Sequence, residues 1–296
     1  MSKSKKPNTT SVYSEQSAAV LSYKRVDPER FLSLPSGKFT SPSTITPLMF
    51  SVIAMAAVYS IAFYKREQYE TVSEWLGITK YYGIPIVIFG FSFWALSILI
   101  FKYFKIRAQR KALSLRIVPD TLGFVLSSST VDQVIENIES SVEEPRKFML
   151  LNRIILVLKS IRNVGRIADI DEMLMSSADA DDSRIENSYT LIRGFVWAIP
   201  VLGFIGTIFG LTETIGKFSD VLKNESIADN AGHTSLVEGM KGAIGGLDTA
   251  FFTTGLALVA ALLIHLLLTF IRKSDDELLD ETRDYCHQYI VSRVRV

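Results

Sequence analysis

The chain has 296 residues, of which 48% are hydrophobic, and its 32 Lys and Arg residues nearly balance its 31 Asp and Glu residues. A net charge of +1 excludes the broadly basic surface that nucleic-acid binding requires, so we expect no nucleic-acid partner. The mean hydropathy of +0.24 is high for a soluble protein, and the apolar residues collect in four long runs, so the composition predicts an integral membrane protein.

The N-terminal segment precedes all four apolar runs. We expect residues 1–44 to form a flexible arm with a short amphipathic piece near residues 28–34. The first two uncharged runs cover residues 45–64 and 81–101. About twenty helical residues cross a hydrocarbon core of ~30 Å, so these runs predict a first transmembrane hairpin over residues 45–101.

The middle of the chain has a different pattern. Residues 102–193 are rich in charge and carry apolar side chains at three- and four-residue steps, which predicts a helical domain outside the membrane. Asp181, Asp182 and Ser183 suit the start of a helix that begins near Arg184 and continues into the third run.

The third and fourth uncharged runs cover residues 194–211 and 250–271 and predict a second transmembrane hairpin over residues 194–271, with a short connector between the runs. Pro200 lies inside the third run, where we expect a kink that neighbouring helices must tolerate. The last segment, residues 272–296, is expected to continue the fourth helix out of the membrane. The predicted fold is therefore all-α, with four transmembrane helices and a helical cytoplasmic segment.

The basic residues are distributed unevenly among the segments outside these runs. Seven precede residue 45, fourteen lie in residues 102–193 and five follow residue 271, whereas only three lie in each of the two connectors. Because Lys and Arg gather on the cytoplasmic side of membrane proteins, we expect both termini and the middle segment in the cytoplasm.

Small and hydroxyl-bearing residues form a stripe on the third run. Gly203, Thr207, Gly210 and Thr214 are spaced by four, three and four residues, so they share one helix face. Gly206 lies beside this face and forms a GxxxG pair with Gly210. A stripe of this kind is typical of a helix that has a close neighbour.

The fourth run carries a matching stripe. Ala250, Thr254, Ala257 and Ala261 repeat at four, three and four residues and lead to His265. Two readings of the stripes stay open at this point. Small residues allow close helix packing, and facing hydroxyls at mid-span can also solvate an ion in a pore.

Ionisable groups are scarce in the four runs, where His265 is the only one. It is either a proton relay, since an imidazole titrates near physiological pH, or a neutral side chain that is hydrogen-bonded to a neighbouring helix. Asp248 and Glu213, just beyond the runs, are further candidate titratable groups. Because no run carries a carboxylate, a partner chain would have to supply the one that an ion pathway needs.

The sequence carries no pattern that is typical of an enzyme or a metal site. Cys286 is the only cysteine, and neither an HExxH nor a GxSxG motif occurs. We therefore expect no catalytic activity, no bound metal and no cofactor.

Two segments of the second hairpin resemble a known family. Residues 199–210 read IPVLGFIGTIFG, and residues 247–261 read LDTAFFTTGLALVAA. They are similar to the pore hairpin of the MotA/TolQ/ExbB proton-channel proteins. Four spans with an inside N-terminus resemble the MotA layout, although Thr249 stands where ExbB and TolQ have a glutamate.

The resemblance implies a homopentamer whose third and fourth spans surround a central pore. A dimer of single-span partners of the MotB, TolR or ExbD type would occupy that pore, and each partner would contribute a membrane aspartate. By the same resemblance, Thr207 and Thr254 are pore threonines. Thr214, Ala257 and Ala261, which lie on the same two stripes, are further candidate residues of the ion pathway. Gly203, Gly206 and Gly210 fall on small packing positions.

The expected function is the pore-forming subunit of an H⁺- or Na⁺-driven motor complex in a bacterial inner membrane, where it contacts lipid. The transported ion would be its only small-molecule ligand. A non-conducting membrane scaffold and a transporter-associated subunit remain as alternatives.

Overall fold

A computed structural model describes residues 21–31, 34–64, 83–115, 130–161, 167–224 and 232–293 of the protein. Almost all of this part of the chain is helical, as the sequence predicts. The strands within it are a parallel pair of two residues each, β1 (Leu21–Ser22) and β2 (Val142–Glu143). The protein is therefore an all-α membrane protein, with β1 and β2 as a small local addition.

Four helices in the described ranges are long and apolar enough to cross a membrane. They contain the first, third and fourth uncharged runs and the second run from residue 84 onward, and three of them extend well beyond the runs. The expected third and fourth spans, in particular, form only part of two much longer helices. These four helices are α3 (Ile45–Tyr64), α5 (Ile84–Leu113), α9 (Thr190–Asn224) and α10 (Gly232–Tyr289).

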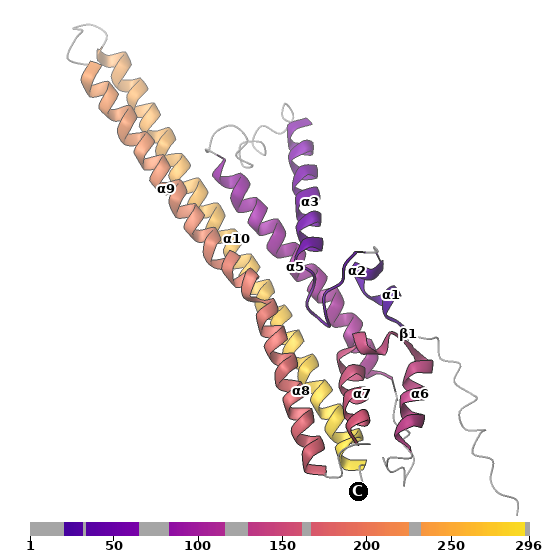
Figure 1. Ribbon diagram of the computed structural model, residues 1–296. Helices are drawn as coiled ribbons and strands as arrows, with labels where there is room; N and C mark the ends of the chain where they lie inside the picture. Colours follow the sequence, from indigo (N-terminus) through magenta and orange to yellow (C-terminus); the bar gives the residue numbers. More distant parts are fainter. Residues whose placement is uncertain are drawn as a thin grey trace, which may run out of the picture.

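The helices α9 and α10 lie side by side as a long antiparallel hairpin that extends past the upper ends of α3 and α5 (Figure 1). We expected a short connector between the third and fourth runs, and most of that segment is helix instead. The reason lies in the residues after the third run: Ile215 and Phe218 keep the helical spacing, and Glu213 pairs with Lys217 one turn later. The end where residues 225–231 join α9 to α10 is called the loop end below.

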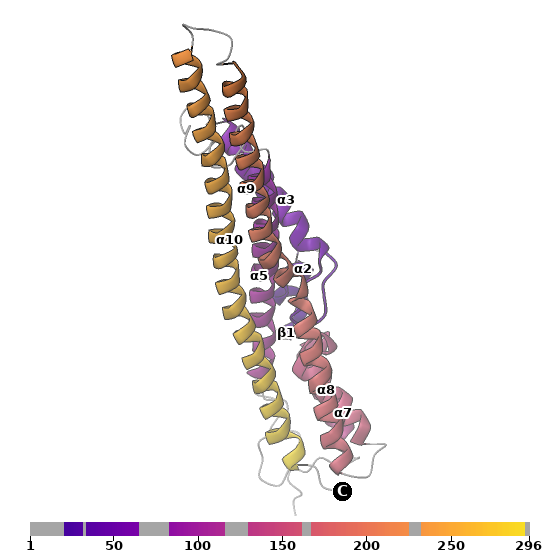
Figure 2. The ribbon, with the colours of Figure 1, turned by 90° about the vertical axis from the view of Figure 1, so that its left-hand side faces the viewer.

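The helix α5 packs against one side of this hairpin, and α3 packs on α5. Figure 2 looks onto the hairpin with α3 and α5 behind it. A core cluster joins the three helices and includes Ile88 and Leu99 of α5, Ile192 and Ile199 of α9, and Ile264 of α10. Most large side chains of α3 are exposed, as is expected for a helix that faces lipid.

The opposite end of the molecule, called the base below, holds the shorter helices. They are α6 (Val131–Ser141), the 3₁₀ turn η2 (Pro145–Lys147), α7 (Met149–Ile161) and α8 (Ile167–Ser188). Apolar side chains of these helices form a second core cluster with the last turns of α10, which is followed by the short turn η4 (Val291–Arg293).

The helix α8 corrects one expectation. A helix was expected to begin near Arg184, with Asp181 at its cap. In the structure α8 already includes both residues. The helix is interrupted only at Tyr189, the single residue between α8 and α9. Asp181 is 3% exposed and accepts a hydrogen bond from the buried guanidinium of Arg153 at 2.8 Å, so it stabilises the interior of the base rather than a helix start.

The described part of the N-terminal segment includes two short helices. Residues 1–20 of the expected arm lie outside the described residues. Beyond them, α1 (Tyr23–Val26) and α2 (Pro28–Phe31) lie against the end of α5. The ammonium group of Lys105 on α5 is buried and lies 2.6 Å from the carboxylate of Glu29. A buried ion pair of this kind attaches the segment to α5.

Candidate functional site

The two stripes of small residues face each other along the α9–α10 contact. A methyl group built on Gly203 would lie 2.6 Å from Cβ of Ala257, and one built on Gly210 would lie 2.5 Å from the carbonyl oxygen of Gly246. A methyl group on Gly206 would collide with the hydroxyl of Thr253. The close approach of the two helices therefore depends on glycine at these positions.

Threonine hydroxyls mark the register of this contact. The hydroxyl of Thr214 donates to the carbonyl of Ala243 at 3.1 Å, and that of Thr207 lies 3.4 Å from the carbonyl of Ala250. Thr207 and Thr214 are seven residues apart on α9, and their partners Ala250 and Ala243 are seven residues apart in the opposite direction on α10. The repeated contact fixes one helix against the other over two full turns.

At the centre of the contact, the hydroxyls of Thr207 and Thr254 are hydrogen-bonded to each other. Thr254 Oγ1 also lies 2.9 Å from the carbonyl oxygen of Ala250 and 3.1 Å from that of Gly203. Both threonine side chains are half-buried, so the pair is reachable from one side of the hairpin. The structure thus brings together the two threonines that the sequence singled out.

The bonding of this pair determines what it can bind. Each hydroxyl has one proton and two lone pairs. When Thr207 donates to Thr254 and Thr254 donates to a carbonyl, both protons are used, while three of the four lone pairs remain. The pair can therefore act as an acceptor, for a cation, a water molecule or a protonated acid, without the cost of a buried charge.

The accessible side of the hairpin is turned away from α5. Phe204 is 61% exposed and lies five residues after Ile199, which is buried in the cluster with α5. Five residues correspond to about 140° around a helix, so Phe204 and the α5 contact are on different faces. On α10, Phe251 and Leu258 are exposed beside Thr254. The threonine pair thus lies in an apolar face that the described residues leave uncovered.

Two predicted pathway residues have a different place. Ala257 is fully buried and Ala261 is 7% exposed, and both belong to the core cluster between the helices. The methyl group of Ala257 fills the space beside Gly203, and Ala261 packs in the same cluster, so both side chains contribute to the packing of the hairpin. Pro200 is half-buried in α9, which continues as one helix through it.

The candidate titratable groups are spread along the hairpin and do not gather at the threonine pair. The side chain of His265 is exposed on α10, and so is that of Asp248. Glu213 is half-buried and forms an ion pair with Lys217 on its own helix. Thr249, at the position where a glutamate was considered, is buried and donates to the carbonyl of Gly245 at 3.1 Å.

The sequence analysis missed a buried polar cluster near the base. Lys102 of α5 pairs with Asp275 of α10, and the hydroxyl of Tyr189 donates to the same carboxylate at 2.8 Å. All three side chains are fully buried. The only signal for this cluster was a lysine directly after the second run and an aspartate shortly after the fourth, and neither residue indicates its partner.

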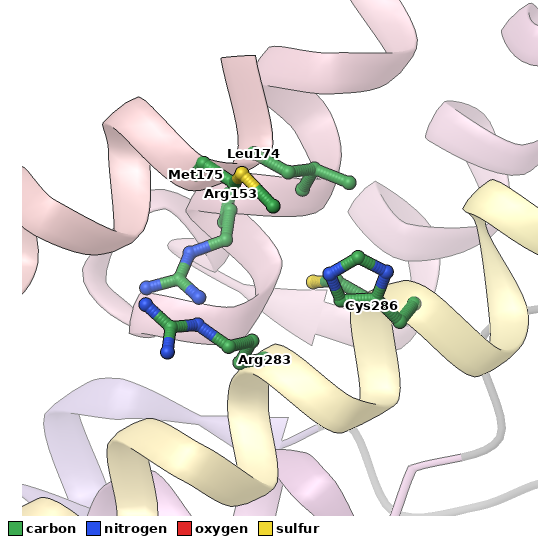
Figure 3. A pocket seen from close by; sticks show the side chains of 6 residues that line it. Arg153, Leu174, Met175, Arg283 and Cys286 are labelled. Carbon is green, nitrogen blue, oxygen red and sulfur yellow. The ribbon is translucent and has the colours of Figure 1, made fainter. Parts of the chain in front are cut away.

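A small cavity lies deeper in the base, between α7, α8 and α10 (Figure 3). Its volume is about 10 Å³, room for about one water molecule. Cys286 contributes to its wall, and burial raises the pKa of that thiol to about 11. Arg153 and Arg283 also line the cavity. The cavity is too small for an organic ligand.

A comparison with models of protein families matches residues 150–284 to the MotA/TolQ/ExbB proton channel family. The match begins in α7, includes α8 and α9, and ends in α10 five residues before that helix does, so it includes the threonine pair. Comparisons with curated proteins and with solved structures gave no match.

Proposed function

Because residues 150–284 belong to the MotA/TolQ/ExbB proton channel family, we propose that the chain is the pore-forming subunit of a motor complex driven by H⁺ or Na⁺ flow. Five copies form a ring in a bacterial inner membrane. A dimer of single-span partners stands in the ring, and each partner carries an aspartate at the level of Thr207 and Thr254. The complex converts ion flow into mechanical work.

The observation that carries this proposal is the threonine pair on an uncovered apolar face. A partner aspartate that binds and releases an ion needs a neighbour that can donate or accept without holding a charge of its own. The hydroxyls of Thr207 and Thr254 have spare lone pairs and no competing carboxylate nearby in the described part of the hairpin. They therefore suit an acid in its protonated form or a cation next to it.

The orientation of the subunit follows from its charge. Of the 32 Lys and Arg residues, 26 lie before residue 45, in residues 102–193 or after residue 271, so the base lies in the cytoplasm together with both termini. The loop end of α9 and α10 then faces the outside. In this orientation an inward-moving charge gains about 2.3 kcal/mol per 100 mV of membrane potential, which can drive a stepwise movement.

The test replaces each hydroxyl by a methyl group of the same shape. Thr207→Val and Thr254→Val complexes, purified with the co-eluting partner and placed in liposomes, should show ion flux reduced at least tenfold relative to the unchanged complex. Thr212→Val on α9 and Thr269→Val on α10 are matched controls, because each of these hydroxyls bonds only to the preceding turn of its own helix among the described contacts. The controls should conduct normally.

The second candidate is a non-conducting scaffold, and the close contact at Gly203, Gly206 and Gly210 favours it, because packing within one chain already accounts for these glycines. The same experiment separates the two functions. Flux that is unchanged in both valine variants, in complexes that assemble normally, would reject the pore and leave the scaffold. Purification without any single-span partner would also reject the motor complex.

A further inference from the structure

Three parts of the molecule meet at the carboxylate of Asp275. Asp275 belongs to α10, four residues beyond the last residue of the fourth uncharged run. Lys102 follows the second run directly on α5, and Tyr189 is the break between α8 and α9. The side chain of Asp275 therefore links the α9–α10 hairpin, to which it belongs, with α5 and with the junction between α8 and α9.

The contacts at this carboxylate are unevenly distributed. The ammonium group of Lys102 and the hydroxyl of Tyr189 both bond to Oδ2 of Asp275. Lys102 Nζ also lies 4.1 Å from the centre of the Tyr189 ring. The other oxygen of Asp275, Oδ1, is buried and has no hydrogen-bond partner among the described residues. A buried acceptor of this kind is costly to leave unpaired.

A neighbouring cluster on the same helix shows the contrast. One turn along α5, Lys105 Nζ contacts Glu29, the hydroxyl of Ser36 and the carbonyls of Gly37 and Ser41. The two oxygens of Glu29 each accept a backbone N–H as well, at 2.9 and 2.8 Å. This network is saturated, and saturated polar networks hold one arrangement rigidly.

The cluster at Asp275 has an unused acceptor and two donors on one oxygen, so a second arrangement is available to it. If α10 moves relative to α5, either donor can pass from Oδ2 to Oδ1 without losing its partner. Elements with two discrete arrangements are the ones that transmit a movement between distant parts of a protein. The position of the cluster at the α8–α9 break is where such a transmission would be needed.

We propose that Asp275 is a positioning residue that, through Tyr189 and Lys102, passes a displacement of the α9–α10 hairpin at membrane level on to α5 and to the helix α8. The role of this coupling rests on the proposed function, in which ion flow moves the hairpin. The experiment that tests the coupling does not require ion flow. Asp275 makes no contact with the ion pathway itself.

The experiment measures hydrogen exchange of backbone amides in α8 and at its junction with α9, with the full chain purified together with its partner. Gly206→Ala displaces the hairpin at membrane level, because the added methyl group collides with Thr253. Tyr189→Phe removes one donor to Asp275 and keeps the ring. Tyr285→Phe is the matched control, because that hydroxyl donates to the carbonyl of Leu115 in the base.

Gly206→Ala should accelerate exchange in residues 174–189 by about tenfold, the size expected from one hydrogen bond to a charged group. In the Tyr189→Phe background the acceleration should fall below about twofold, and in the Tyr285→Phe background it should stay about tenfold. Equal acceleration in the two backgrounds would overturn the proposal. So would an absence of any effect of Gly206→Ala on α8.

Should Gly206→Ala not assemble, Gly203→Ala displaces the same contact, because its methyl group would lie 2.6 Å from Cβ of Ala257, and the same pattern is expected. Ion flux through the complex is measured in parallel and is interpreted separately. A complex without flux contradicts the proposed function, and the exchange pattern still tests the coupling.

Discussion

The α9–α10 hairpin is held together in two different ways along its length. Across the uncharged runs, the contact consists of glycine, alanine and threonine, and the two backbones approach closely at Gly210 and Gly246. Towards the base the same hairpin is stabilised by buried charges, with Lys102 and Asp275 as the principal pair. The contact in the first region depends on small side chains, and the contact in the second depends on the pairing of opposite charges.

The difference follows from the solvent that surrounds each region. In a bilayer, an unpaired charge is costly and the hydrophobic effect does not drive helices together, so close packing and hydroxyl bonds have to stabilise the contact. Near the membrane surface, a charge can be buried when it has a counterion, and each buried charge therefore requires one specific partner residue. The membrane region therefore sets how close the helices are, and the base sets which elements they meet.

The largest effect is expected at the base. Lys102→Ala should lower the free energy of unfolding by about 3–5 kcal/mol, because it leaves the charge of Asp275 buried without a counterion. Thermal unfolding of the purified complex in detergent measures this loss. Arg110→Ala removes an exposed pair with Glu277 on the same two helices and should cost no more than about 1 kcal/mol. Equal losses would show that burial does not distinguish the pairs.

The membrane region should respond to a single methyl group with opposite signs at two glycines. Gly206→Ala should destabilise the hairpin by about 1–3 kcal/mol through overpacking against Thr253. Gly216→Ala, on the same helix with open space around it, should stabilise it by up to about 1 kcal/mol, since alanine favours a helix. The same thermal assay compares them, and a Gly206→Ala variant as stable as Gly216→Ala would contradict the close contact.

A smaller effect is expected from a buried hydroxyl group inside the glycine contact. Thr253 is fully buried in the glycine contact and donates to the carbonyl of Thr249 at 2.9 Å. Thr253→Val should cost about 0.5–1.5 kcal/mol, the worth of one buried hydrogen bond. Thr253→Ser, which keeps the hydroxyl, provides the comparison in the same unfolding measurement. A larger loss in the serine variant would mean that the methyl group matters more than the bond.

The smallest effect should be seen at Cys286 in the base. Its pKa is raised to about 11 by burial, so at pH 8 only about one thiol in a thousand is ionised. Maleimide should therefore leave the folded chain unlabelled for hours and label it after denaturation, as mass spectrometry can measure. Ser292→Cys in a Cys286→Ala background offers an exposed thiol that should react within minutes. Rapid labelling of Cys286 would indicate that the base opens.

The sequence predicted the membrane region better than the base. Four uncharged runs and two stripes with helical spacing were sufficient to identify the membrane fold and to pair Thr207 with Thr254, because both signals lie within a single helix. The family resemblance of the hairpin is confirmed by the family model. The assignment of Ala257 and Ala261 to an ion pathway stays a prediction. Both are buried in the core cluster, and spacing assigns a face to a residue without saying what covers that face.

The base was less predictable because its contacts join distant parts of the chain. Lys102 and Asp275 are 173 residues apart, and no periodicity connects them. The break at Tyr189 was missed for a similar reason: nothing in the local sequence ends a helix there. The outward continuation of α9 and α10 was missed because each span was bounded by its uncharged run, although Glu213 and Lys217 stabilise the helix that contains them.

The glycine contact has a mechanical consequence. With Gly210 against the backbone of Gly246, and Thr214 and Thr207 in register with α10, neither helix can slide or rotate on its own without a collision. The hairpin must move as one stiff lever, with its stiffest section inside the membrane. A displacement inside the membrane would therefore be carried by both helices towards Tyr189, where α9 begins and α8 ends.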